Sequence, residues 1–369
     1  MADPLLSAND RAILNVVRRS EGLVRSGIAG KTHLTQPSVH RILDSLVQRG
    51  LIRVGEARAS GPGKPSPEIH LDREHHFSLG ISVNTDEATV CLANLAGEVV
   101  AVKNLPDPSD RTRILRDTAT ATDQMLAEVG RTSDDLIGVG LAIAGFFVAK
   151  GQLNAPEPLS EWSLVDLDHH LSEVFSCRTW VENNATTGAI GESFWGVGRR
   201  ASHFAYFSFN YGFGGGAILD GQPYRGSHGN AMEISEVFDD VEMQDRPALS
   251  YLLEELRAEN VEIASVAELR RHFDPDWPGV EAWIERIMPA LSRAVRAVRS
   301  VLDPQVIVFG GEIPEVLAER LIERIEERPS DWYRYGAPPP TLELAFTEAP
   351  DVGPALGAAL IPLTAQIFA

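Results

Sequence analysis

VENNATTGAIGESFWG, residues 181–196, joins the end of an apolar strand to a helix rich in small residues. The strand ends at Glu182, two amides follow at Asn183 and Asn184, and the helix continues from Ala185. Open α/β sheets bind their ligands in the crevice at the carboxyl ends of their strands. This stretch therefore predicts a binding site in which the two amides take part.

Composition indicates a globular protein of two or three domains, since the chain has 369 residues and 44% of them are hydrophobic. No apolar run approaches the roughly 20 residues that a membrane helix requires, and the start of the chain lacks the basic and apolar regions of a secretory signal. Cys91 and Cys177 both stand in apolar, strand-like surroundings, which favours core cysteines over a redox or metal pair. We expect a cytoplasmic protein with no membrane partner.

The net charge of −19 is unevenly distributed along the chain. Residues 1–70 hold 10 Lys and Arg against 6 Asp and Glu, whereas the remainder holds 23 against 46. This asymmetry is typical of a small nucleic-acid-binding module joined to an acidic domain. Chance clustering of solvated charges is the alternative explanation.

The first seventy residues predict a winged helix-turn-helix. Ser7 and Asp10 resemble a capping box for a helix that runs to about Arg19, and a short helix is expected over 27–32. A third helix, capped by Thr35, would be the helix that enters the DNA major groove. Its candidate DNA contacts are Gln36, Pro37, Ser38, His40 and Arg41, with Arg58 and Lys64 in the wing meeting phosphate. The alternative is a helical cap whose polar face only contacts water.

From about residue 77 the pattern changes to strands alternating with helices, which indicates an α/β architecture with mixed sheets. The expected strands are 79–83, 88–94, 98–104, 136–144, 178–182, 204–209 and 216–219. The expected helices are 112–129, 246–258, 280–301 and 315–327.

Five separate segments resemble, in order, motifs of the ROK family (repressors, open reading frames and sugar kinases). They are residues 137–162, ENNA at 182–185, RGSHGNAMEISE at 225–236, LDPQVIVFGGEI at 302–313 and DVGPALGAAL at 351–360. The resemblance implies a two-lobed, actin-like (ribonuclease H-like) sugar-kinase fold behind the winged helix-turn-helix. The implied domains are 1–72 for DNA binding and 73–369 for sugar binding, with lobes at about 77–195 plus the C-terminal helix and about 196–350.

The resemblance also implies which residues bind a sugar effector. They are Gly145, Asn154, Glu157, Asn183, Asn184, His228, Glu233 and Glu236. Amides and carboxylates suit the alternating donors and acceptors of a polyol. Some of these side chains could instead only tie loops together.

The kinase chemistry of the family is missing at three places. Asn184 stands where the kinases carry the catalytic aspartate, and an amide has no useful basicity. Residues 82–87, SVNTDE, replace the D-I-G-G-T-K phosphate loop with two carboxylates that would repel a polyanion. Glu236 replaces the zinc-binding histidine and no cysteine follows Cys177, so we expect no metal and no cofactor.

These features predict a sugar-responsive transcriptional regulator that is not an enzyme and that acts as a repressor of carbohydrate-metabolism genes. Its expected partners are an operator in double-stranded DNA, a sugar or sugar-phosphate effector, and a second copy in a homodimer or dimer of dimers. The alternative is an ATP-dependent sugar kinase with a displaced catalytic base, and a weaker one is a scaffold that binds neither DNA nor sugar.

Overall fold

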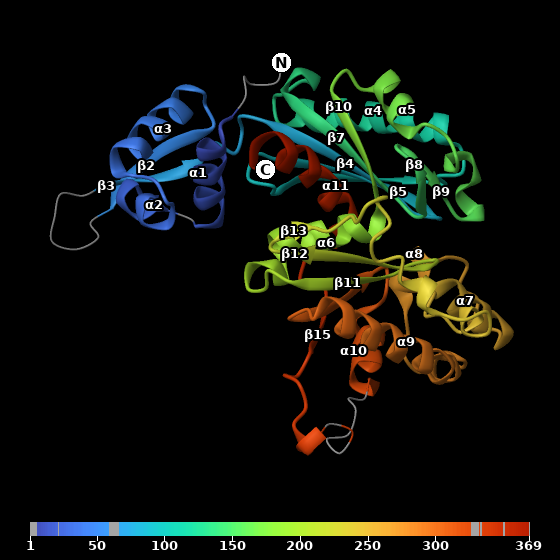
Figure 1. The fold of residues 1–369 in the computed structure, drawn as a ribbon. Coiled ribbons are helices and arrows are strands. Elements are labelled where there is room, and N and C mark those ends of the chain that lie inside the picture. The colour runs from blue at the N-terminus through green and yellow to red at the C-terminus, as the bar shows by residue number, and fades with distance from the viewer. Residues whose placement is uncertain are drawn as a thin grey trace.

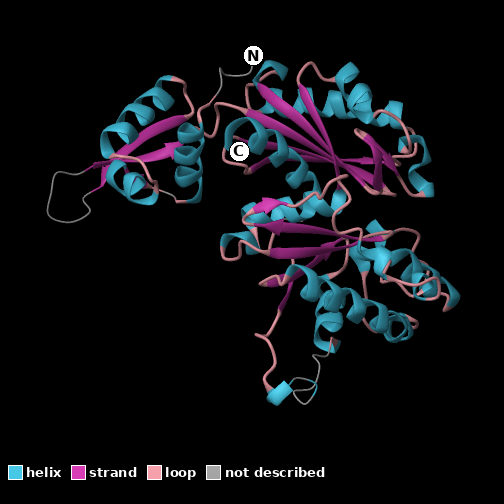
Figure 2. Ribbon diagram, viewed as in Figure 1, coloured by secondary structure: helices cyan, strands magenta, loops and turns pink. Residues whose placement is uncertain are grey.

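The computed structural model describes residues 6–20, 22–58, 66–325, 332, 334–349 and 351–368. It contains three bodies, each with its own sheet (Figure 1). A small N-terminal body lies beside the upper of two stacked α/β bodies, as Figure 2 shows by the separation of the strands into three groups.

The N-terminal body holds three helices against a small antiparallel sheet. The helices are α1 (Ala8–Arg19), α2 (Arg25–Lys31) and α3 (Gln36–Gln48). The strands β1 (Leu23–Val24), β2 (Ile52–Arg58) and β3 (Ser66–Leu71) pair in the order β1-β3-β2. The predicted capping box is present, because Ser7 Oγ accepts from the Asp10 amide at 3.2 Å and the Asp10 carboxylate accepts from the Ser7 amide at 2.8 Å.

The upper body is built on a five-stranded sheet in the order β10-β7-β4-β5-β6. Its strands are β4 (Phe77–Val83), β5 (Glu87–Asn94), β6 (Val99–Pro106), β7 (Leu136–Ile143) and β10 (Arg178–Asn183). The first three form an antiparallel meander, and β7 and β10 run parallel to β4. Helices α4 (Arg111–Glu128) and α5 (Leu167–Val174) pack against this sheet, and a hairpin of β8 (Phe146–Ala149) and β9 (Gln152–Asn154) follows β7.

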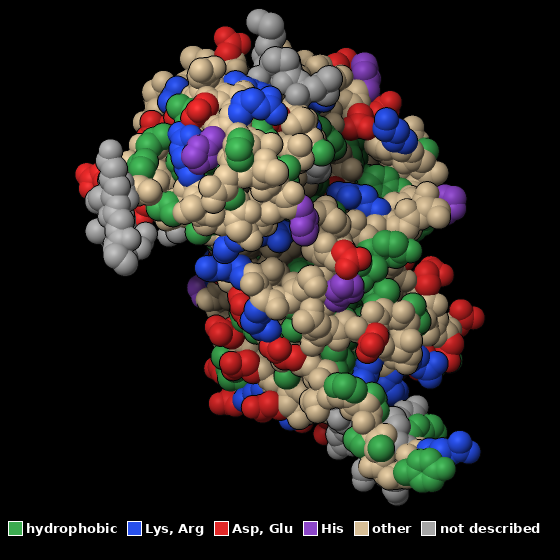
Figure 3. All heavy atoms as spheres, turned by 60° about the vertical axis from the view of Figure 1, so that its left-hand side comes forward, with side chains coloured by type: hydrophobic (Ala, Val, Ile, Leu, Met, Phe, Trp, Pro, Cys, Tyr) green, Lys and Arg blue, Asp and Glu red, His purple; other side chains and the backbone are tan. Residues whose placement is uncertain are grey.

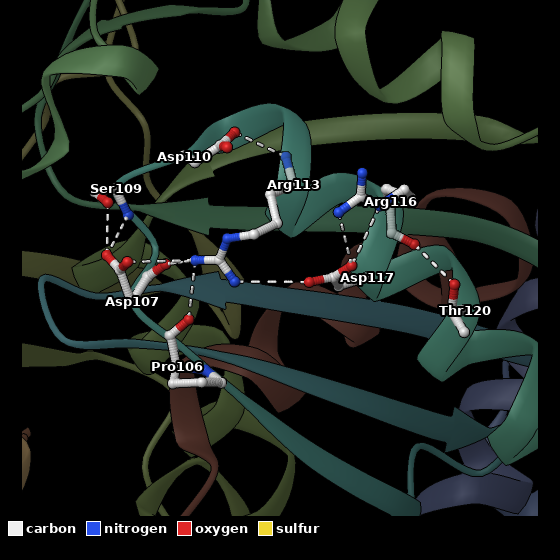
Figure 4. Close-up of polar contacts among 8 residues, drawn as sticks. All are labelled: Pro106, Asp107, Ser109, Asp110, Arg113, Arg116, Asp117 and Thr120. Atoms are coloured by element: carbon white, nitrogen blue, oxygen red, sulfur yellow. Dashed lines mark hydrogen bonds and ion pairs between the residues drawn. The ribbon is translucent and has the colours of Figure 1, made fainter.

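A network of polar contacts holds the connection from β6 to α4 (Figure 4). Asp110 caps α4 by accepting from the Arg113 amide at 2.9 Å. The Arg113 guanidinium reaches back to the Pro106 and Asp107 carbonyls and lies 3.6 Å from the Asp117 carboxylate. These contacts fix the turn at which the meander passes into its covering helix.

The C-terminal helix of the chain lies on the upper sheet. Helix α11 (Gly353–Leu363) packs against α6 (Asn184–Trp195) and across β4 and β7. The approach is so close that a Cβ on Gly80 would lie 1.9 Å from the Ala355 carbonyl oxygen. Only glycine fits at that position, which is why α11 can cover the sheet directly.

The lower body has a second five-stranded sheet in the order β13-β12-β11-β14-β15. Its strands are β11 (Phe204–Phe209), β12 (Phe213–Leu219), β13 (Gln222–Pro223), β14 (Val306–Gly311) and β15 (Glu343–Phe346). Helices α7 (Leu249–Ala258), α8 (Val266–His272), α9 (Val280–Leu302) and α10 (Glu315–Arg324) belong to this body, while α6 lies between the two sheets (Figure 1).

Each expected helix and strand is present with its ends shifted by at most a few residues, but the structure also has α5, α8, β15 and the β8–β9 hairpin, which were not expected. Helix α7 begins at Leu249 rather than at residue 246, because Pro247 disfavours helical backbone at the residue before it. Cys91 is buried, as expected, whereas Cys177 is only half-buried. In the described part of the chain, no helix is long and apolar enough to cross a membrane.

Candidate functional site

Helix α3 presents the predicted DNA contacts on one exposed face. Its opposite face is buried through Val39, Ile42, Leu43 and Leu46, which the 3.6-residue period places together. Gln36, Pro37, His40 and Arg41 are exposed, whereas Ser38 is half-buried.

Short polar contacts hold α3 in place. Ser38 Oγ accepts a hydrogen bond from Thr35 Oγ1 at 3.0 Å, and an ion pair of 2.7 Å between Arg25 and Asp44 ties α2 to α3. Arg58 ends β2 but its side chain lies outside the described residues, as does all of Lys64. Figure 3 shows this side of the molecule, with acidic side chains numerous over the lower body.

The junction of β10 and α6 brings three of the predicted effector residues together. Asn183 caps α6, because its Oδ1 accepts from the amides of Ala185 at 2.7 Å and Thr186 at 3.3 Å. Its Nδ2 donates to the Gly145 carbonyl at 2.8 Å. Gly145 has a φ of 125° and lies so close to Asn154 that a Cβ would stand 2.4 Å from that residue's carbonyl oxygen. The Asn183 amide therefore has a structural task at this junction.

Asn184 lies beside that junction and has a different environment. The residue is only 6% exposed, and among the described residues its side-chain amide makes no hydrogen bond. The amide is nevertheless open to solvent, since neither of its polar atoms is fully enclosed. A ligand hydroxyl would satisfy both the donor and the acceptor of this amide.

The Glu182 carboxylate is taken up by two contacts within the protein. Its carboxylate is 4% exposed and lies 2.5 Å from Arg225 Nε. The other carboxylate oxygen accepts from the Asn183 amide at 3.0 Å. These two contacts give Glu182 a structural role at the end of β10.

The remaining predicted effector residues are not brought into one hydrogen-bonded set in the described part of the chain. Asn154 and Glu157 are exposed, and the Asn154 Oδ1 lies 3.5 Å from Ser163 Oγ. Glu233 is half-buried, and its burial, followed by the charge of Glu236, raises the pKa of its carboxyl. Glu236 itself is exposed.

His228 stands apart from this group. It is exposed and lines a cavity of about 1080 Å³ that none of the other predicted effector residues lines. Four cations line that cavity, namely Arg18, Arg19, Lys150 and Arg225. Arg18 and Arg19 were not among the predicted residues, because their spacing is that of ordinary basic residues at a helix end.

Carboxylates occupy the turn between β4 and β5, where the kinases of the resembled family have their phosphate loop. Asp86 Oδ2 accepts a hydrogen bond of 3.1 Å from the Ala267 amide in the first turn of α8, so a side chain of the upper body contacts the backbone of the lower one. Glu87 lies 4.0 Å from Arg271 on the same helix.

A third carboxyl group faces the same turn. Glu312 follows β14 and is 7% exposed. Its burial, followed by the nearby Asp86 charge, raises the pKa of its carboxyl to about 8. The turn therefore favours cations and protons over a second anion.

Comparison with known protein families finds matches for two segments of the chain. Residues 78–238 match the model of the ROK family, and residues 6–53 match that of a winged helix-turn-helix DNA-binding domain. The resemblance read from the sequence is thereby confirmed for both parts.

Two curated relatives span nearly the whole chain. An uncharacterized protein of Sinorhizobium fredii is 28% identical over 99% of this chain and 93% of its own length. The xylose repressor of Caldicellulosiruptor bescii is 22% identical over 88% of each chain.

Solved structures confirm the fold class. A ROK family transcriptional regulator, described as a homolog of the Escherichia coli MLC protein, matches with a TM-score of 0.71 at 16% identity, over 98% of this chain and 96% of its own. The ROK hexokinase of Thermus thermophilus matches with a TM-score of 0.57 at 20% identity, over 77% of this chain and 97% of its own. The ROK fold thus occurs both in regulators and in kinases.

Proposed function

From the premise that this chain joins a winged helix-turn-helix DNA-binding domain to a ROK family domain, we propose that it is a sugar-responsive transcription regulator. It represses genes of carbohydrate metabolism and does not phosphorylate its effector. The observation that carries the proposal is the fusion of a DNA-reading helix to a sugar-kinase fold. The carboxylates at the turn between β4 and β5 support the absence of kinase activity.

The DNA-binding part of the proposal rests on α3. Its N-terminal turn exposes Gln36 and Pro37, and the next turn exposes His40 and Arg41. Glutamine and arginine side chains can form paired hydrogen bonds with base edges in the major groove. A homodimer, or a dimer of dimers, would place two such helices on the half-sites of a two-fold operator.

The effector part rests on the carboxyl end of β10. Asn184 has an amide there that makes no hydrogen bond within the described residues and that solvent can reach, and the Glu233 carboxyl is half-buried. We propose that these two side chains contact the sugar or sugar phosphate, that Asn183 and Gly145 shape its cradle, and that Asn154, Glu157, His228 and Glu236 line its approach. Buried polar groups of this kind reject ligands that cannot satisfy them.

The absence of phosphoryl transfer rests on two features. An asparagine amide at position 184 cannot accept the proton of a sugar hydroxyl. A nucleotide phosphate at the turn between β4 and β5 would have to displace the Asp86 carboxylate from the Ala267 amide, and it would meet Glu87 as well. Like charges at such short distances repel strongly where water is scarce.

We propose that the chain is divided into two domains, one for DNA and one for the sugar. Residues 1–72 form the DNA-binding part and residues 73–369 form the sugar-binding part. The lobes of the latter are about 77–195 with the C-terminal helix and about 196–350. The two five-stranded sheets support this division, as does the packing of α11 on β4 and β7. Effector binding between the lobes would change operator affinity only to the extent that the ligand prefers one lobe arrangement.

The test is a thermal shift over a panel of sugars and sugar phosphates, followed by operator footprinting with and without the stabilising compound. Binding to the native state raises the unfolding temperature with ligand concentration. We expect one sugar class to stabilise the protein and to change the footprint. ATP-dependent phosphorylation of that sugar would instead establish the kinase alternative, and no footprint under any condition would refute the regulator.

A further inference from the structure

A cavity of about 1080 Å³ lies where the three bodies meet. Its walls come from α1 of the DNA-binding body, from the β8–β9 hairpin, β10 and α6, from the segment 221–230 of the lower body, and from the C-terminal segment 361–368. In Figure 3 blue Lys and Arg side chains gather where the upper and lower parts of the molecule meet. This cavity adjoins the carboxyl end of β10, since Glu182 and the predicted effector residue His228 line it, but it does not include the amides of Asn183 and Asn184.

The charge of the cavity wall is positive. Four Lys and Arg side chains line it against two carboxylates. Glu182 is paired with Arg225 at 2.5 Å, and burial raises the pKa of the Asp168 carboxyl, which the charge of Lys150 only partly opposes. Within the described residues, Arg18 and Arg19 at the end of α1 form an ion pair with neither carboxylate.

The guanidinium of Arg18 is partly desolvated by the residues that pack around it. Its guanidinium lies 3.9 Å from the centroid of the Phe194 ring and 5.4 Å from that of Phe368. Its Nε is buried and has no hydrogen-bond partner. Burial, followed by the charge of Arg19, lowers the pKa of Arg18 to about 10. The aromatic contacts offset part of the desolvation of this cation, but they leave its donors unsatisfied.

Arg19, the next residue along α1, is a second cation at the wall of this cavity. It is exposed, lines the same cavity, and makes no ion pair within the described residues. Within the described residues neither guanidinium has a carboxylate partner, and the planar fork of each matches phosphate geometry. Stabilisation of the α1 dipole explains basic residues in its last turn, but it does not explain a guanidinium packed on two aromatic rings at the wall of a cavity of this size.

We infer that this cavity is a second ligand site and that it binds a small organic phosphate. The phosphate group pairs with Arg18 and Arg19, and the body of the ligand lies along Trp180 and Phe194, which also line the cavity. An anion there offsets the repulsion between the two arginines and pairs with their guanidinium groups. Because α1 belongs to the DNA-binding body, the bound ligand joins that body to both lobes of the ROK domain.

The experiment measures binding by isothermal titration calorimetry on the full chain. The probes are inorganic phosphate and glycerol 3-phosphate, with glycerol as the neutral control. We expect both phosphates to bind, glycerol not to bind, and affinity to fall as salt is raised. Arg18→Met and Arg19→Gln should each weaken binding by about tenfold or more, since each removes a charge-assisted contact. Arg257→Gln, which changes an exposed arginine of α7 outside the cavity, should bind as the wild type does.

The outcomes separate this inference from the proposed function. Absence of phosphate binding, or equal binding in the wild type, Arg18→Met and Arg19→Gln, overturns the second site while leaving the sugar response untouched. Arg19 is exposed, so Arg19→Gln keeps the test decisive even if Arg18→Met fails to fold. The link to DNA rests on the proposed function, and it is measured separately as a change of operator affinity on adding glycerol 3-phosphate, a change that Arg19→Gln should abolish.

Discussion

The free energy of unfolding of the wild type should fall as the pH rises towards 8, and Glu312→Gln should abolish that fall. The Glu312 carboxyl has a pKa of about 8 in the folded state, against an ordinary 4.5. Between these two values the folded chain holds a proton that the unfolded chain does not. The stability that this proton contributes is therefore complete below pH 4.5 and is lost as the pH rises through about 8.

The magnitude follows from the size of the shift. One unit of pKa difference corresponds to about 1.4 kcal/mol, so the shift of Glu312 corresponds to about 5 kcal/mol in all, of which about 2 kcal/mol falls between pH 6 and 8. Glutamine has nearly the same volume as glutamate and carries no charge at any of these pH values. The variant therefore packs as the wild type does but has no titrating carboxyl at position 312.

The assay is urea unfolding at pH 6, 7 and 8 for the wild type, Glu312→Gln and Glu319→Gln. Glu319 is an exposed carboxylate on α10 and serves as the matched control. Groups that titrate in all three proteins cancel in the comparison. Relative to the wild type, Glu312→Gln should gain about 2 kcal/mol of unfolding free energy from pH 6 to pH 8. Identical pH dependence in the wild type and Glu312→Gln would refute the reasoning.

Three further outcomes are expected. Arg41→Ala should weaken operator binding by about 1–3 kcal/mol without changing sugar binding, measured by fluorescence anisotropy and calorimetry, and unchanged operator affinity would exclude α3 as the recognition helix. Asn184→Ala should weaken effector binding by about 1–3 kcal/mol while leaving operator affinity of the ligand-free protein intact, and an unaltered dissociation constant would remove Asn184 from the effector site. Gly80→Ala should lower the free energy of unfolding by more than about 2 kcal/mol, because its Cβ would overlap the α11 backbone. Gly30→Ala is the contrasting case: Gly30 lies in the last turn of α2 with open space around it, and the change should raise that free energy by about 0.5–1 kcal/mol, so similar losses in both variants would contradict the packing argument.

Local signals in the chain predicted much of the architecture. The apolar period of α3 and the capping box at Ser7 are properties of neighbouring residues, and the structure has both. The meander β4–β5–β6 likewise follows from alternation within short stretches. The role of Glu182 could also be inferred, since side chains alternate along a strand.

The candidate site was predictable in its residue types but not in its contacts. The amide at position 184 follows from the sequence, while its lack of a hydrogen-bond partner follows only from the packing around it. Asn183 shows the converse, because its amide is taken up by the cap of α6 and by Gly145, which is 38 residues away in the chain.

The sequence by itself predicted a basic helix-turn-helix, an acidic α/β remainder, and a resemblance to a family of sugar kinases in which Asn184 stands where the kinases carry their catalytic aspartate. Tertiary structure alone decided that Asp86 meets α8, that Glu312 is buried beside it, and that Arg18 faces a cavity between three bodies. The physical reason is distance along the chain. Periodicity and capping report on residues within a few turns of each other, whereas burial, desolvation and ion pairing depend on which distant segments pack together.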